Sequence, residues 1–350
     1  MSSPLRISRR AFAQAGVGIA AAIALPGLRA QGPRLEKPRL TMAVGGKSAF
    51  HCLPLIVAEQ LGYFRSEGLE LEIVDAQVGA MVLDAVSMGA ADFACGAFEH
   101  TIVLQGRGQF YQSVVLLGRA PQIALGVSAR ALPNYRAIAD LRGRRIGVSS
   151  PGSSTSMVAS MVLARAGVSP ADVSFVGVGT AANALTALRS GQIDAMSNID
   201  PVMTMLEQRG EVRIITDTRT LKGTQEVFGG PMPAACVYAS QDFVQKHPAT
   251  CQAVANGVVH ALKWLQTAGP GDLIKAVPEA YLLGDRALYL ASFAKGREGM
   301  SPDGLMAEDG ARTALRALGS FDSGVRTDTI QVGRTFTNDF ARRAKDKFRA

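Results

Sequence analysis

A turn rich in serine, threonine and glycine, residues 149–155, carries the densest group of side chains that could bind a ligand. It precedes a helical pattern, so its backbone N–H groups lie at a predicted helix start. Free N–H groups together with hydroxyls form a ready site for a carboxylate, sulfonate or phosphate. Serine and threonine are also preferred N-capping residues, so ordinary capping explains the same pattern, and both interpretations stand. The candidate ligand contacts in this turn are Gly152, Ser153, Ser154 and Thr155.

Four further turns follow predicted strands, at residues 46–51, 77–81, 97–100 and 198–200. Gly79 and Ala80 precede another helix and offer a second group of free N–H groups. Ser48 and His51 could direct a hydroxyl and an imidazole at the same ligand, although a capping or surface histidine fits His51 equally well. Asn198 is a candidate contact in the last of these turns.

Two carboxylates belong to these turns. Glu99 stands beside His100, but no nucleophile or metal-binding set accompanies the pair, so we expect Glu99 to contact a ligand and not to catalyse a reaction. A solvated acid at a helix start is the alternative. Asp200 precedes Pro201, and we expect it to face an amine or ring N–H of the ligand, with helix capping as the alternative. On that interpretation, Asp200→Ala weakens binding and leaves the fold intact.

The charges in these turns indicate the class of ligand. They hold two acids but Lys47 as the one certain cation, whereas a small inorganic anion such as nitrate would favour more arginine or lysine. Buried carboxylates need partners. We therefore expect an organic ligand with an amine, amidine or ring N–H at one end and an acid or polar oxygen at the other. Phe50, Phe98 and Phe228 could pack against its ring or alkyl part, although each also fits a core position.

Cofactor and metal chemistry lack the residues that would carry them. The four cysteines form no CxxC pair, the four histidines are scattered, and the GxGxxG and GxSxG motifs are absent. We therefore expect no cofactor, no metal and no catalytic group. Cys52 and Cys95 follow neighbouring strands in a 2-1-3 strand order, so a disulfide between them is a hypothesis. Four buried thiols are the alternative.

The elements that hold these turns form a repeating β-turn-α pattern. In the first half, strands are predicted at 39–44, 69–74, 92–95, 113–117 and 123–127, with helices at 53–61 and 81–88. In the second half, strands are predicted at 145–148 and 173–176 and a third ends at 198–201, with helices at 156–166 and 181–190. Ligands of open α/β sheets bind at the carboxyl ends of strands, where the candidate turns lie.

This duplication predicts an α/β protein of two lobes, joined by a hinge of two crossings with a cleft between them. The crossings are expected near 127–130 and 228–233. Residues 31–127 and 234–350 then form lobe 1, with a strand at 234–239 and a long helix at 249–268, and residues 128–233 form lobe 2. A single large α/β domain is the alternative for a chain of 350 residues.

The first 30 residues predict a twin-arginine signal peptide that directs the chain to the periplasm. Ser8, Arg9, Arg10 and Phe12 form the twin-arginine pattern, and the apolar stretch at 15–25 is too short to span a bilayer comfortably. An uncleaved signal anchor is the alternative. The net charge of +8 falls to +4 without the four arginines of this segment. That charge is too small and too scattered to predict nucleic-acid binding.

Several sequence blocks, taken in their order and spacing, match one family. They are residues 54–64, 67–69, 88–93, 141–148 and 188–195 with Pro201. In these blocks the chain resembles the periplasmic substrate-binding proteins of ABC importers in the nitrate/sulfonate/taurine (NitT/TauT, SsuA) and thiamine-precursor group. The resemblance implies a type II periplasmic binding fold that closes on a small organic ligand, whether a sulfonate, an amine-bearing molecule or a heterocycle. It also implies delivery to an ABC permease and ATPase complex.

Two other functions are alternatives. Thiamine-precursor synthases resemble these binding proteins, but they use a cysteine-rich motif and iron-binding histidines that this chain lacks. We therefore expect a binding protein and not an enzyme. A ligand sensor that docks on a signalling kinase is the other alternative, because the sequence does not separate sensing from transport.

Overall fold

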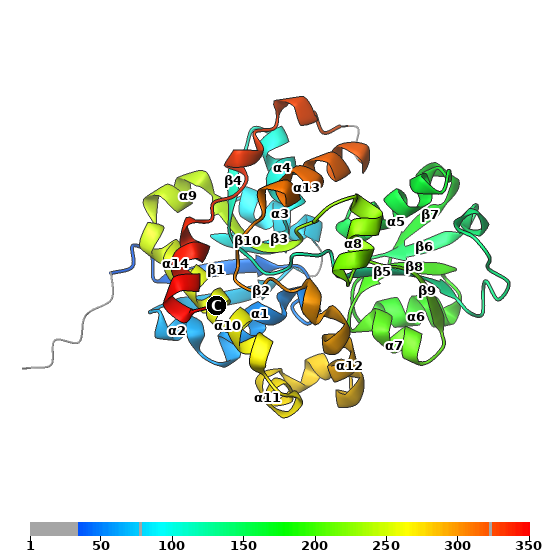
Figure 1. Cartoon of the computed structure of the whole chain (residues 1–350), viewed down its shortest axis with the longest axis horizontal. Helices are drawn as coiled ribbons and strands as arrows, with labels where there is room; N and C mark the ends of the chain where they lie inside the picture. The colour runs from blue at the N-terminus through cyan, green and yellow to red at the C-terminus, as the bar shows by residue number, and fades with distance from the viewer. Residues whose placement is uncertain (1–33, 77–78, 322–323) are drawn as a thin grey trace, which may run out of the picture. The chain divides into compact units, whose positions relative to one another are not determined.

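The computed structural model describes residues 34–76, 79–321 and 324–350, with the backbone alone at residues 79 and 80. Residues Leu35–Ala350 form one compact unit (Figure 1). The signal peptide predicted for residues 1–30 lies outside the described residues. Within the described ranges, no helix combines the length and the apolar character needed to cross a membrane.

The first sheet has the strand order β2-β1-β3-β10-β4 in the described part of the chain. Its strands are β1 (Arg39–Val44), β2 (Glu70–Asp75), β3 (Phe93–Ala97), β4 (Tyr111–Leu116) and β10 (Ala235–Ser240). β1 lies parallel between β2 and β3, and β10 runs antiparallel between β3 and β4. The expected 2-1-3 order is confirmed, so the turns after β1 and β3 leave the same end of the sheet.

The second sheet repeats this pattern with the order β7-β6-β8-β5-β9 (Figure 1, green). Its strands are β5 (Ile123–Ser128), β6 (Arg145–Val148), β7 (Ser174–Gly177), β8 (Ala195–Ile199) and β9 (Val212–Asp217). β6 is parallel to β7 and β8, while β5 is antiparallel to β8 and β9. The prediction of two α/β lobes is therefore confirmed.

β5 lies in a different lobe from the one predicted. The sequence analysis assigns the strand at 123–127 to lobe 1 and the first crossing to 127–130. In the structure β5 pairs with β8 and β9, so the first crossing is the segment 117–122 between β4 and β5. All six residues of β5 are buried, and the partners that bury them are far away in the sequence. The second crossing, 229–234, lies where it was predicted.

Helices cover both sheets. Those that follow first-sheet strands are α1 (Leu53–Gln60), α2 (Tyr63–Ser66), α3 (Gly79–Ser87), α4 (Glu99–Gly106), α9 (Gln241–Lys246), α10 (Pro248–Thr267) and α11 (Pro270–Ala276). Those of the second lobe are α5 (Ser154–Arg165), α6 (Ala182–Ser190), α7 (Val202–Gln208) and α8 (Leu221–Phe228). α12 (Arg286–Gly296), α13 (Glu308–Phe321) and α14 (Asp339–Phe348) complete the chain. α10 packs against α1, α2 and α14. Gly257 permits this approach, since a Cβ there would lie 2.5 Å from the Phe64 ring.

The C-terminal segment returns to the second lobe. α12 packs on α7, and Leu288 is buried in the same apolar cluster as Val202 and Leu206 (Figure 1). α13 lies against both α4 and α5. The assignment of all of 234–350 to lobe 1 is therefore incomplete for α12, which bridges the lobes: Leu288 is buried in the lobe 2 cluster, whereas Tyr289 and Phe293 are buried in the first-lobe cluster.

Most predicted elements are confirmed to within a few residues. β1 and β6 have the predicted bounds, and α1 and α10 each differ by one residue per end at most. The sequence analysis missed β9 and α8, and it did not delimit α4 or α7. Phe228, expected in the hinge, is the last residue of α8.

Candidate functional site

A cavity of about 280 Å³ lies between the two lobes. The predicted contacts that line it are His51, Glu99, Gly152, Ser153, Ser154 and Thr155. Further polar lining residues are Ser149, Ser150, Thr180, His100 and Arg107, and apolar ones include Leu83, Val103, Met157, Ile199, Met232, Leu318 and Phe321. The structure thus brings together polar residues at the starts of α4 and α5 and surrounds them with apolar side chains.

The start of α5 is built from hydroxyls that hold one another. Ser153 is the N-cap, and its Oγ accepts from the N–H of Ser156 at 3.4 Å. The Oγ1 of Thr155 lies 2.7 Å from the Ser153 hydroxyl and 3.0 Å from that of Ser149. The Oγ of Ser150 is buried and has no hydrogen-bond partner among the described residues. Ordinary capping, one of the two interpretations of this turn, is therefore present, and the same residues line the cavity, so ligand binding stays a prediction.

Glu99 connects the two lobes. It is the first residue of α4, and its Oε1 accepts a 2.5 Å hydrogen bond from the Oγ of Ser154, the first residue of α5. Only 6% of Glu99 is exposed. Burial raises the pKa of its carboxyl, and the hydrogen bond from Ser154 acts in the opposite direction. Glu99 is therefore a buried acid on the cavity wall, and not the solvated acid considered as the alternative.

The two lining histidines have different surroundings. The Nδ1 of His100 lies 2.9 Å from the hydroxyl of Tyr238, and burial together with the nearby Arg107 charge lowers the pKa of His100 to about 4. His100 is therefore neutral at neutral pH. Burial also acts to lower the pKa of His51, but the adjacent Cys52 and the backbone of Gly45 outweigh it, and the net direction is upward.

Asp200 is placed away from the cavity lining and is already paired. Its carboxylate lies 3.3 Å from the Nη1 of Arg219, and its Oδ1 accepts from the N–H of Thr204 at 2.8 Å. Asp200 and Arg219 are 3% and 1% exposed. The expectation that Asp200 faces a ligand amine is corrected: a protein guanidinium takes that place, and the carboxylate helps to cap α7.

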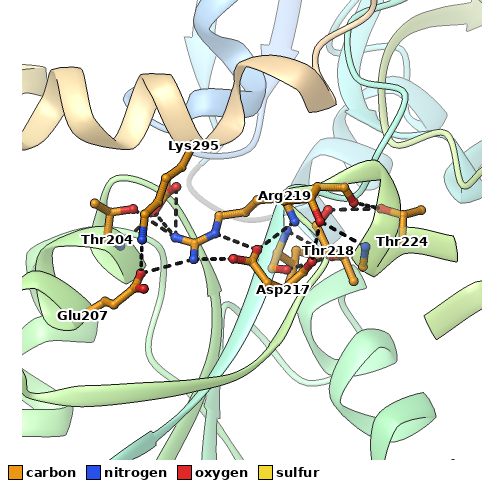
Figure 2. A network of polar contacts seen from close by, with 11 residues as sticks. Thr204, Glu207, Asp217, Thr218, Arg219, Thr224 and Lys295 are labelled. Carbon is orange, nitrogen blue, oxygen red and sulfur yellow. Dashed lines mark hydrogen bonds and ion pairs between the residues drawn. The ribbon is translucent and has the colours of Figure 1, made fainter. Parts of the chain in front are cut away.

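Arg219 joins three acids into one buried network (Figure 2). Its Nη2 donates to Asp217 at 2.7 Å and to Glu207 at 3.2 Å, in addition to the contact with Asp200. Lys295 of α12 also reaches Glu207, at 2.6 Å (Figure 2). The network therefore ties β9, α7 and α12 together and is structural.

The remaining second-lobe and aromatic candidates also lie off the cavity lining. Asn198 is buried, and its Nδ2 donates to the carbonyl of Gly179 at 2.9 Å. Phe98 and Phe228 are buried in an apolar cluster, and Phe50 packs on Tyr289 with ring centroids 4.7 Å apart. These side chains support the turns that carry the site.

The first-lobe turns are placed as follows. Ser48 is half-buried in the turn after β1, and neighbouring Lys47 forms an ion pair with Glu59 at 3.1 Å. Gly79 and Ala80 begin α3, and their side chains lie outside the described residues. Lys47, the one certain cation in the predicted turns, is thus paired within the first lobe.

All four cysteines are buried free thiols in the structure. An interaction between the thiols of Cys52 and Cys95 lowers the pKa of Cys52, in keeping with the proximity that the 2-1-3 order predicts, but no disulfide joins them. In the described part of the chain, no group of three or more His, Cys, Asp or Glu side chains could hold a metal ion.

A more open groove of about 600 Å³ lies beside β1 and β2 in the first lobe. Two of its charged pairs, Lys37–Asp92 and Arg39–Glu70, already satisfy one another at 2.6 and 2.7 Å. The cavity between the lobes is the stronger candidate because both lobes line it and it contains a buried acid without a cationic partner.

Comparison with known proteins identifies the family. The pattern described as NMT1/THI5 like matches residues 49–268, which is more than half of the chain and reaches both lobes. The chain belongs to the NMT1/THI5-like family. A solved structure of a protein from Bordetella bronchiseptica RB50 is 53% identical, covers 91% of this chain and 100% of its own, and superposes with a TM-score of 0.87.

Other relatives of this NMT1/THI5-like chain are more distant. The alkanesulfonate-binding protein SsuA from Xanthomonas axonopodis pv. citri, bound to MOPS, is 20% identical over 87% of this chain and 99% of its own, with a TM-score of 0.69. The match confirms the two-lobed binding-protein fold. The 4-amino-5-hydroxymethyl-2-methylpyrimidine phosphate synthase of Legionella pneumophila is 26% identical over 32% of this chain. The match spans about a third (34%) of the synthase.

Several lining residues escaped the sequence analysis. Leu318 and Phe321 come from α13, more than eighty residues after Ala235, the lining residue that precedes them in the chain, and no local pattern links them to the cavity. Ser149 and Arg107 could have been predicted, since Ser149 directly follows β6 and Arg107 directly follows α4. Their position next to predicted contacts was the available signal.

Proposed function

We propose that this chain is an extracytoplasmic solute-binding protein that captures a small organic molecule between its lobes and delivers it to an ABC importer. The cavity is the observation that carries this proposal. Both lobes line it, and the Ser154–Glu99 hydrogen bond crosses it. A ligand there would touch both lobes at once, so binding would favour the closed arrangement.

The size and lining of the cavity support an organic ligand. A volume of about 280 Å³ is close to the lower end of small-molecule pockets, ~300 Å³. Hydroxyls and Glu99 offer polar contacts on one part of the wall, while Met157, Met232 and Phe321 offer apolar contacts on another. A small inorganic anion would leave this apolar surface unused.

The location and partner are part of the same proposal. The twin-arginine pattern at Arg9 and Arg10 supports export to the periplasm. There an ABC permease and ATPase complex would select the closed, ligand-bound form and release the molecule on opening. No covalent step is required of the protein.

A thermal-shift screen of residues 31–350 tests binding. The panel holds sulfonates, nitrate, aromatic acids, pyrimidines, amines and ureas. A ligand at a thousandfold over its Kd adds about 4 kcal/mol to stability, or several degrees in Tm. We expect a hit among the organic solutes. The proposal fails if no compound shifts the Tm and no small molecule is released from the denatured protein.

A cavity-filling variant is the control for this screen. The ring of Ser154→Phe would occupy the cavity at the start of α5, so the variant should fold and lose the shift. A shift that persists in Ser154→Phe would move the ligand to another part of the molecule.

Transport and sensing are separated by uptake. Deleting the gene and measuring cellular uptake of the hit compound should show a loss if the chain serves an importer. Unchanged uptake, with a changed transcriptional response to the compound, would instead favour a ligand sensor for a signalling kinase.

An enzymatic role is the second candidate, and one observation favours it. Hydrogen bonds with Cys95 and His51 lower the pKa of the Cys52 thiol, which favours a reactive thiolate. Cys52 is fully buried, however, and lies off the cavity lining. Iodoacetamide treatment at neutral pH decides this point: rapid alkylation of Cys52 in the folded protein would support a nucleophile, whereas protection would support binding alone.

A further inference from the structure

The two buried acids singled out by sequence have different partners. Asp200 faces the guanidinium of Arg219 at 3.3 Å. Among the described residues, Glu99 has no lysine, arginine or histidine within salt-bridge distance, and its side chain is held by the Ser154 hydroxyl. Burying a carboxylate is costly unless its charge is compensated. Glu99 is therefore the one of these two acids whose negative charge is not fully compensated by other described residues.

Glu99 also has unused capacity to accept hydrogen bonds. An ionised carboxylate offers two oxygens and about four acceptor positions. The bond from Ser154 engages Oε1. Since Glu99 lines the cavity, a ligand can donate to the remaining positions.

The charges near Glu99 do not replace such a donor. His100, the next residue, is neutral because burial lowers its pKa to about 4, and its Nδ1 is engaged by Tyr238. Arg107 also lines the cavity, but it follows the last residue of α4 and is exposed. Its charge lies close enough to His100 to lower the pKa of that imidazole, but among the described residues no ion pair joins Arg107 to Glu99.

Glu99 makes the start of α5 less favourable for an anionic ligand. Helix N-termini attract anions, but here the Glu99 carboxylate is already hydrogen-bonded to the first residue of α5. A ligand sulfonate or carboxylate at this point would lie beside a like charge in a site of low polarity. A nitrogen group of the ligand that donates hydrogen bonds would instead satisfy the remaining acceptor positions of the Glu99 carboxylate.

We propose that Glu99 determines the ligand specificity of this site by accepting hydrogen bonds from a cationic amine or amidine group and by excluding oxyanions from the start of α5. The inference rests on the proposed solute-binding function and narrows it. The ligand specificity inferred for this chain differs from that of the alkanesulfonate-binding protein SsuA. The two proteins are 20% identical, and at that level the similarity extends to the fold alone.

Matched compounds test this specificity. The probes place an amine or amidine, an uncharged amide, and a sulfonate or carboxylate on the same benzyl, butyl and pyrimidine scaffolds. Their affinities are measured by calorimetry for wild-type residues 31–350, for Glu99→Gln and for Glu226→Gln. Glu99→Gln removes the charge but keeps an acceptor for Ser154. Glu226→Gln is the control, since the Glu226 side chain on α8 is exposed.

We expect wild type to prefer the cationic member of a scaffold that binds. Because hydrogen bonds to charged groups contribute strongly to binding, Glu99→Gln should lower the affinity for the cationic compound about tenfold or more. The variant's preference for the cationic compound over the sulfonate should become smaller or reverse. Glu226→Gln should keep the wild-type ranking.

Two results overturn the inference while leaving the proposed function standing. One is a wild-type preference for oxyanions over their cationic counterparts. The other is a Glu99→Gln variant with an unchanged ratio of cation to oxyanion affinity. The absence of binding by every probe, together with no released small molecule, would count against the proposed function and remove the basis of the inference as well.

Discussion

At the scale of single residues, the buried charges of this protein separate into those that are paired within the protein and one, Glu99, that lies on the cavity wall. Arg219 is 1% exposed and contacts Asp200, Asp217 and Glu207. A buried cation of this kind is tolerated because several carboxylates surround it. Glu99 has no such partner in the described chain and lies on the cavity wall. The presence of a protein counter-charge therefore distinguishes residues that hold the fold from one that could hold a ligand.

Asp200→Ala is expected to destabilise the protein, in contrast to the intact fold anticipated from sequence. Removing one partner of a buried ion pair leaves an uncompensated charge and costs about 3 kcal/mol, and the N–H of Thr204 also loses its acceptor. Urea denaturation measures this loss. The exposed pair Asp242–Lys246 provides the control, since Asp242→Asn should change stability by less than about 0.5 kcal/mol. An Asp200→Ala variant as stable as wild type would show that Asp217 and Glu207 suffice for Arg219.

Asp194 should give the stability a dependence on acid pH. Its carboxylate accepts from the N–H, Nε and Nη2 of Arg145 at 2.9, 3.1 and 2.8 Å, and these contacts lower its pKa. Because the folded-state pKa lies below the unfolded value of about 3.9, the contribution is complete well above pH 4. It is lost as the pH falls through the folded-state pKa.

The variant Asp194→Asn isolates this effect. Since Arg145 is half exposed, we expect wild type to exceed the variant by about 1 kcal/mol at pH 7. In urea denaturation the difference should shrink as the pH falls below about 4 and should vanish once the pH is below the folded-state pKa of Asp194. A difference that stays constant over this pH range would show that the ionised form of Asp194 is not what Arg145 stabilises.

Sequence reasoning located the polar turns but could not decide which of their residues face the cavity. The Ser153–Thr155 turn was recognisable because helix starts and strand ends have local signatures. The partner of Asp200 was not, since Arg219 lies 19 residues away on the far side of a helix and a strand. Asn198, which lies in β8 and not in the turn predicted after it, and Phe98, which directly follows β3, are likewise turned into the interior.

At the scale of elements, α12 is the one whose placement matters most for the second lobe. Leu288 is buried among α6, α7 and β9 residues, and Asp285 caps the helix by accepting from the N–H of Leu288 at 2.9 Å. Lys295 adds the contact with Glu207 (Figure 2). A helix from the C-terminal third of the chain thus contributes Leu288 to the core of lobe 2, while its Tyr289 and Phe293 are buried in the first-lobe core.

Leu288→Ala should therefore weaken lobe 2 more than lobe 1. Truncating a buried leucine costs about 2–5 kcal/mol through lost burial and the cavity it leaves. Hydrogen exchange should accelerate in α7 and β9 before it does in β1 and α10. Leu221→Ala, at a position 38% exposed, is the matched control and should leave the exchange pattern unchanged. Equal acceleration in both lobes would indicate a single cooperative unit.

The strands illustrate what local sequence can and cannot predict about elements. β1 and β6 have short apolar runs bounded by turn residues, and their bounds were predicted correctly. β5 has an equally clear run, yet its lobe was predicted wrongly because antiparallel pairing with β8 and β9 depends on residues about 70–90 positions away. β9 is only half-buried along most of its length, which left a weak apolar signal.

At the scale of the whole molecule, we expect that the second lobe does not fold independently, because Leu288 of α12 is part of its core. A fragment of residues 119–233 contains all strands of the second sheet but lacks α12. We expect it to keep some secondary structure and to unfold without a cooperative transition. Fusing residues 283–299 to its C-terminus through a flexible linker should restore cooperativity in a calorimetric scan. Cooperative unfolding of the unfused fragment would show that α12 is dispensable.

Segments near the C-terminus complete a sheet and a core that begin much earlier in the chain, and this has a consequence for biosynthesis. β3 and β4 cannot complete their sheet until β10 is translated, more than one hundred residues after β4. Lobe 2 in turn waits for Leu288. At about 5–20 residues per second, the ribosome needs roughly 7–30 seconds to carry the chain from β3 through β10. During that interval strand edges and apolar faces stay uncovered, which is a hazard for aggregation. Translation must therefore finish before folding can, and a nascent chain of this protein would depend on chaperones that hold it until its last helices emerge.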